Sequence, residues 1–188
     1  MKTSQTLSAL ALTALATLCA PSWAKGLVIN QAVTEAEVQA AQAGWCKALV
    51  DISSTHAKSG QPAAKALAEK VIDSAYGYQM GAVLFKPTLT VNPQTFRTNR
   101  AGALAYFVGG DATFPKDKGF ALNGWTHCSY ENAAVFITGN SATTMGKVNI
   151  TGKDGKVTTV DKTWQFVKDN EGKLRIVLHH SSLEFAGG

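Results

Sequence analysis

The first part of the chain after residue 33 carries apolar side chains at helical spacing. They recur every three or four residues, on one stripe of a helix, at Val38, Ala41, Trp45, Leu49 and Ile52. Thr34 and Glu37 have the spacing of a capping box at the helix start. After Ser59-Gly60, the pair Gln61-Pro62 can open a second helix, because proline is tolerated in a first turn. The pattern predicts one helix over about 34–57 and a second over 61–75.

The pattern becomes strand-like from residue 83. A short strand over 83–85 is followed by Lys86-Pro87, and Asn99 can cap a third helix over 100–108. Tight turns then separate extended segments over 124–131, 133–138, 142–151, 157–168 and 174–183. Strands joined by tight turns are antiparallel. Helices followed by an antiparallel sheet indicate a single α+β domain.

The N-terminus has the features of an export signal. Lys2 precedes an apolar run from Leu7 to Leu18, and small residues at Ser22 and Ala24 fit a cleavage site. We therefore expect residues 1–24 to be a signal peptide and residues 25–188 to be the mature domain. This predicts a periplasmic or secreted protein that has no membrane association after cleavage.

Two cysteines, Cys46 and Cys128, remain after that cleavage. An oxidising compartment permits a disulfide between them. Two buried free thiols are the other interpretation, because cysteine is among the most buried residue types. The sequence leaves both open.

The closing hairpin resembles a known family. An aromatic strand over 163–166, a Gly172-Lys173 turn and a strand ending in His179-His180-Ser181 are similar to the last hairpin of the association domain of calcium/calmodulin-dependent kinase II. The helix and strand order over 34–184 also resembles the NTF2-like superfamily, including its SnoaL-like members. The resemblance implies an NTF2-like cone, in which N-terminal helices pack in a strongly curved antiparallel sheet around a ligand cavity. It also implies a homodimer or a larger ring.

Candidate site residues follow from this cone. Neighbouring residues of a strand point to opposite faces, so only one of His179 and His180 can face the cavity. If Ile176 and Leu178 point inward, His180 shares their side, where it can act as acid or base. Arg97 could add a positive wall, or be a solvated charge beside a loop. The other candidates are aromatic walls, which could equally be core: Tyr78, Phe85, Trp164 and Phe166.

The remaining composition excludes several classes of function. The formal net charge of +5 is modest, and no basic run interleaved with stacking aromatics is present, so we expect no nucleic-acid partner. His56 and His127 lack the ligand spacing of a zinc site, so we expect no metal and no cofactor.

Three functions stay open on the sequence. The first is an exported protein that binds a small molecule, such as an organic anion, in the cone with His180 as its polar anchor. The second is an enzyme similar to the SnoaL and ketosteroid isomerase proteins, with His180 as the catalytic acid/base. The third is an oligomerisation scaffold without a ligand.

Overall fold

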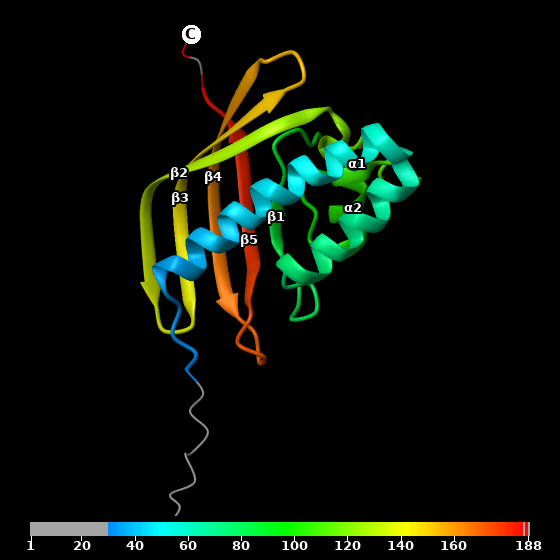
Figure 1. Cartoon of the computed structure of the whole chain (residues 1–188). Helices are drawn as coiled ribbons and strands as arrows, with labels where there is room; N and C mark the ends of the chain where they lie inside the picture. Colours follow the sequence, from blue (N-terminus) through cyan, green and yellow to red (C-terminus); the bar gives the residue numbers. More distant parts are fainter. Residues whose placement is uncertain (1–29, 186, 188) are drawn as a thin grey trace, which may run out of the picture.

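A long helix crosses one face of a five-stranded sheet in this computed structural model, which describes residues 30–185 and 187 (Figure 1). A second helix and the returning half of the first gather at one end of the sheet. The expected signal peptide, residues 1–24, lies outside the described residues. No helix of the described part is both long and apolar enough to cross a membrane.

Helix α1 extends over Glu35–Ala75 and combines the two predicted helices. The capping box is confirmed, because the Thr34 hydroxyl accepts from the Glu37 amide and the Glu37 carboxylate accepts from the Thr34 amide. Gly60 breaks the helical geometry with φ 77° and ψ 178°, and Pro62 follows in the first turn of the second half. The kink folds the second half of α1 back beside the first (Figure 1).

The sheet has the strand order β1-β5-β4-β3-β2. Its strands are β1 (Leu84–Lys86), β2 (Trp125–Thr138), β3 (Ser141–Gly152), β4 (Val157–Lys168) and β5 (Leu174–Leu183). Strand β1 pairs with β5 in parallel, whereas the other pairs are antiparallel. The sheet is therefore mixed, not wholly antiparallel as predicted, because a long connection brings β1 to the edge beside the last strand. It is also not strongly curled.

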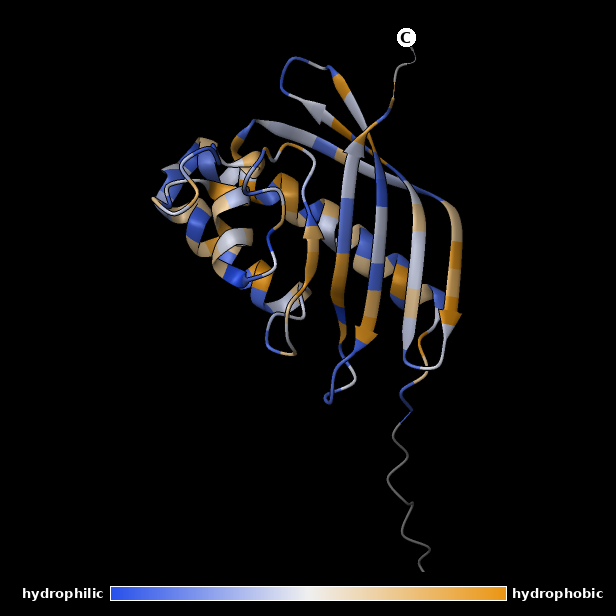
Figure 2. Ribbon diagram, turned by 180° about the vertical axis from the view of Figure 1, so that it is seen from behind, coloured by the Kyte–Doolittle hydropathy of each residue, from blue (hydrophilic) through white to orange (hydrophobic). Residues whose placement is uncertain are grey.

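The core lies between α1 and the inner face of the sheet. Val38, Trp45, Leu49 and Ile52 of the predicted stripe are buried there. Apolar and polar positions alternate along the strands (Figure 2). Each fully buried large apolar side chain contributes about 1.5–3 kcal/mol to folding. Helix α2 (Arg100–Val108), capped by Asn99 as predicted, closes the β1 end of the core with Tyr106 and Phe107.

Candidate functional site

The inner face of β4 places a lysine among aromatic side chains. Alternate residues of the strand are buried: Val160, Lys162, Trp164, Phe166 and Lys168. The Lys162 side chain approaches two indole rings, with its Nζ 4.8 Å from the Trp45 ring centre and 5.5 Å from that of Trp164. Only 4% of Lys162 is exposed. A cationic group therefore lies in the apolar middle of the fold.

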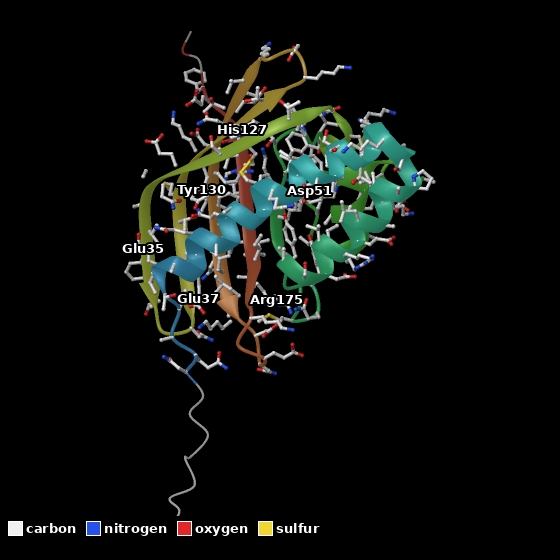
Figure 3. The ribbon with its side chains drawn as sticks, in the orientation of Figure 1. Glu35, Glu37, Asp51, His127, Tyr130 and Arg175 are labelled. Atoms are coloured by element: carbon white, nitrogen blue, oxygen red, sulfur yellow. A yellow bond between two sulfur atoms is a disulfide. The ribbon has the colours of Figure 1, made fainter. Side chains whose placement is uncertain are left out.

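Lys162 differs from the other buried cations. Arg97 pairs with Asp117 at 2.8 Å, Lys168 with Glu37 at 2.7 Å and Arg175 with Asp169 at 2.7 Å; the Arg175 side chain is labelled in Figure 3. No carboxylate of the described part of the chain forms an ion pair with Lys162. Burying a charge is costly unless the charge is paired. The positive charge of Lys162 therefore destabilises the fold unless an anion binds beside it.

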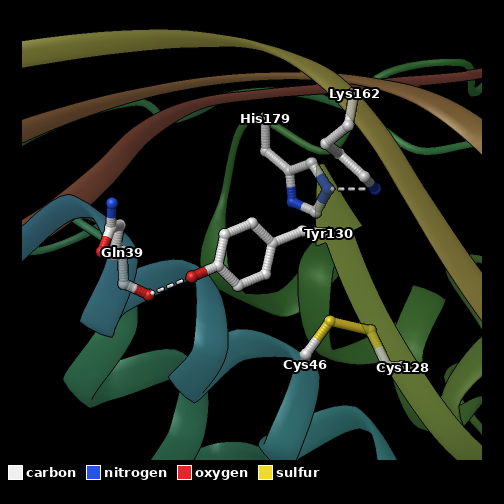
Figure 4. The surroundings of a disulfide bond; sticks show 6 residues. All are labelled: Gln39, Cys46, Cys128, Tyr130, Lys162 and His179. Atoms are coloured by element: carbon white, nitrogen blue, oxygen red, sulfur yellow. Dashed lines mark hydrogen bonds between the residues drawn. A yellow bond between two sulfur atoms is a disulfide. The ribbon is translucent and has the colours of Figure 1, made fainter. Parts of the chain in front are cut away.

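A hydrogen-bonded chain connects Lys162 to α1. Its Nζ lies 2.9 Å from His179 Nε2, and the two side chains point toward each other from neighbouring strands (Figure 4). On the other side of the ring, His179 Nδ1 lies 2.8 Å from the Tyr76 hydroxyl. The Trp45 indole N–H donates to that same hydroxyl at 3.0 Å. The chain fixes the orientation of the imidazole.

Burial shifts the protonation of this chain. It lowers the pKa of Lys162 to about 7, helped by the nearby positive charge of Lys86. Burial and the charge of Lys162 lower the pKa of His179 well below its usual value, so the imidazole is neutral. Burial raises the pKa of Tyr76, which keeps its hydroxyl protonated. Among Lys162, His179 and Tyr76, only Lys162 therefore changes its charge near neutral pH.

Three hydroxyl groups lie beside this series of hydrogen bonds, and we call them the hydroxyl cluster. They belong to Thr88, Tyr106 and Ser181. Ser181 is the register partner of Lys162, and its Oγ lies 2.6 Å from the Thr88 Oγ1. The Tyr106 hydroxyl is buried and makes no regular hydrogen bond to a described residue. Burial raises the pKa of Tyr106, while the adjacent Leu89 and Thr88 groups oppose the shift. The cluster therefore offers donors to a polar ligand.

Aromatic rings form the apolar walls. Phe85 stacks on His179 with ring centres 4.5 Å apart, and Trp45 and Trp164 meet edge to face at 5.6 Å. A small apolar cavity of about 20 Å³ opens on the α1 side of Tyr76. Its lining includes Trp45, Leu49, Ile52, Ala68, Ile72 and Phe107.

Three of the four predicted aromatic walls lie on the inner face. Phe85 and Trp164 contact His179, and Phe166 packs against Trp164 with ring centres 6.2 Å apart. Tyr78 lies one layer further out, where it stacks on Tyr76 and donates its hydroxyl to the Arg97 carbonyl oxygen.

The prediction that His180 faces the interior was wrong. His180 is exposed, whereas His179 is only 2% exposed. The register shifts where Gln165 pairs with Leu178 and Phe166 with Ile176, which leaves Val177 as an extra residue on β5. Such a bulge interrupts the alternation of the strand, so Ile176 and His179 point inward together.

Arg97 is neither a positive wall nor a solvated charge. It is 2% exposed, and its guanidinium group binds both carboxylate oxygens of Asp117. It also lies over the Phe114 ring, with Cζ 4.7 Å from the ring centre. Arg97 therefore fixes the loops around β1 and does not offer a free charge.

Other members of the site were missed by the sequence reasoning. Lys162 gave a signal, because the spacing Val160, Lys162, Trp164 places a lysine on an apolar strand face. Thr88, Tyr106 and Ser181 gave none, because only the pairing of β1 with β5 and the packing of α2 bring them together.

The open question of the cysteines is answered by a disulfide that joins Cys46 of α1 to Cys128 of β2 (Figure 4). In the part that the structure describes, no group of three or more His, Cys, Asp or Glu side chains is gathered as a metal site.

A distant solved structure supports the fold. A protein from Xanthomonas campestris, described as a calcium/calmodulin-dependent protein kinase II association domain, superposes with a TM-score of 0.51 at 22% identity. The match covers 85% of this chain and 97% of that one. It shows the fold alone, and the predicted NTF2-like α+β fold is confirmed.

Nearer relatives identify the family. A crystal structure of an iota-carbonic anhydrase from a cyanobacterium, in complex with bicarbonate, is 65% identical with a TM-score of 0.84 and covers 87% of this chain and 99% of that one. A metal-independent carbonic anhydrase from Nostoc sp. is 64% identical over 168 residues, which are 89% of this chain and 82% of the relative. The family model described as "Metal-independent carbonic anhydrase" matches residues 36–183. The chain thus belongs to the metal-independent carbonic anhydrase family.

Proposed function

We propose that this chain interconverts CO2 and bicarbonate at the hydroxyl cluster beside Lys162. The observation that carries the proposal is a buried ammonium group that no carboxylate among residues 30–185 pairs with, flanked by hydroxyl donors. Bicarbonate has one negative charge to balance Lys162 and oxygen atoms to accept from the hydroxyl groups. The cyanobacterial enzyme that is 65% identical was crystallised with this same anion.

The hydroxyl cluster supplies direction as well as affinity. Ser181 lies on β5, Thr88 lies in the turn that follows β1, and Tyr106 lies on α2, so the three donors approach a ligand from different parts of the fold. Donors that are fixed before the reaction stabilise developing charge at little cost in reorganisation. When water adds to CO2, negative charge develops on the carboxylate oxygens, and this is where the donors and Lys162 act.

The apolar walls suit CO2, the uncharged partner of bicarbonate in the equilibrium. CO2 has no net charge and no dipole, so it suits the apolar surface that the rings of Phe85, Trp45 and Trp164 form around His179. The Trp45 and Trp164 rings also keep bulk water away from the ammonium group, which strengthens its interaction with an anion. The proposed site therefore combines an apolar face for CO2 with a polar face for bicarbonate.

Replacing Ser181 tests the proposal. Ser181→Ala removes one donor, and we expect kcat/KM for CO2 hydration to fall by about 100-fold. Stopped-flow mixing with a pH indicator measures that rate. Ser182→Ala is the matched control, because Ser182 is the next residue of β5, partly exposed, and we expect a rate within about twofold of the native protein. A native protein no faster than the uncatalysed reaction contradicts the proposed function, and an active Ser181→Ala contradicts the placement of the site.

A further inference from the structure

We propose that Lys162 is the proton acceptor for CO2 hydration and the proton donor for the reverse reaction, held in place by His179. The inference rests on the proposed carbonic anhydrase reaction and assigns a second task to a group so far used only for its charge. Its basis is geometric: Lys162 is buried, forms no ion pair with a carboxylate of the described residues, and faces Ser181 across the β4–β5 pair.

In the hydration step, the amine of Lys162 takes the proton that the attacking water loses. The water oxygen forms a bond to the carbon of CO2, one carbon–oxygen π pair moves onto oxygen, and one O–H bond of the water breaks. The proton passes to the neutral amine, so that CO2, water and amine become bicarbonate and ammonium. The ammonium group then releases its proton to buffer in the solvent, which restores the amine.

His179 is a positioning residue in this step. An ammonium group has only donors, so charged Lys162 donates to His179 Nε2, and the proton of the neutral ring is then on Nδ1 facing the Tyr76 oxygen. The same tautomer serves the neutral amine, which donates one N–H to Nε2 and keeps its lone pair free. The imidazole need not titrate, in keeping with its lowered pKa.

The surroundings of Lys162 set the pH at which this works. The groups that face it are His179 from β5, the Trp45 ring from α1 and the positive charge of Lys86 from β1. Its register partner on β3 is Gly146, which has no side chain. Burial and Lys86 hold the pKa of Lys162 near 7, where a general base works best at neutral pH.

Two variants separate charge from proton transfer. Lys162→Arg keeps a cation but cannot release its proton, and Lys162→Met removes both properties. We expect hydration to fall by about 100-fold or more in both, while only the arginine variant retains binding of ¹³C-bicarbonate measured by NMR. Lys156→Met, in the exposed turn between β3 and β4, is the control and should match the native protein.

The native pH profile gives a readout that does not depend on how a variant folds. We expect kcat/KM for hydration to rise with pH and level off above about 7, because the neutral amine is the active form. Lys162→Ala with added methylamine should regain hydration in proportion to the amine concentration. A native profile that is flat between about pH 6 and 8, or an arginine variant within about threefold of native activity, overturns the inference while the proposed function stands. A native protein without activity overturns the proposed function instead.

Discussion

At the scale of single residues, burial of Lys162 lowers the stability of the fold and gives the site its titrating group. The other buried cations have carboxylate partners within the chain, and Lys162 has a neutral imidazole. Its pKa is about 7 in the folded protein against 10.5 for a free lysine. The folded state therefore binds this proton less tightly than the unfolded state, and the difference is a cost to folding.

This cost predicts a pH-dependent gain for Lys162→Met. Below about pH 7 both states are protonated and the cost is complete; between about pH 7 and 10.5 it shrinks as the unfolded chain keeps the proton that the folded protein has lost. We expect the variant to be more stable by a few kcal/mol, roughly, at pH 6.5 and by less at pH 9.5. Urea unfolding at both pH values measures this. A variant less stable than native at pH 6.5 contradicts the account of Lys162.

At the scale of elements, features with a local sequence signature were predictable, and the bulge on β5 was not. The capping box at Thr34, the break at Gly60 and the alternation around Trp164 follow from local sequence, and each is confirmed. The extra residue Val177 has no such signature, because a bulge depends on how β5 fits against β4. Because the prediction assumed unbroken alternation along β5, it pointed His180 inward, whereas the structure points His179 inward.

The parallel pairing of β1 with β5 also lay beyond the local pattern. Residues 83–88 and 178–181 are far apart in the chain, and only this pairing brings Thr88 to Ser181. For this reason the aromatic walls of the site could be predicted from single strands, whereas the hydroxyl cluster could not.

The disulfide joins α1, which carries Trp45 of the site, to β2 at the far edge of the sheet. Cys46 follows Trp45 on α1, and the bond to Cys128 of β2 closes a sequence separation of 82 residues. The loop-entropy model gives about 4.5 kcal/mol for such a link. We expect reduction to lower the free energy of unfolding by roughly that amount, measured by urea unfolding with and without a reductant. The Cys46→Ser, Cys128→Ser double variant is the control, because it should not respond to the reductant; an unchanged native midpoint contradicts the prediction.

At the scale of the whole molecule, the fold brings a polar strip into an apolar interior. The helices cover the inner face of the sheet, and the strip formed by Lys162, His179 and Ser181 crosses β4 and β5 beneath them. The outer side of β2 and β3 leaves Phe136 and Met145 exposed. Assembly into a homodimer or larger ring, and export after cleavage of residues 1–24, stay predictions from the sequence.

Crystals of this protein soaked in bicarbonate would test the central claim most directly. We predict a planar anion within hydrogen-bond distance of the hydroxyl groups of Thr88, Tyr106 and Ser181, with the Lys162 ammonium group beside it. An anion bound elsewhere, for example at the exposed His180, with the hydroxyl cluster unchanged, would contradict the account.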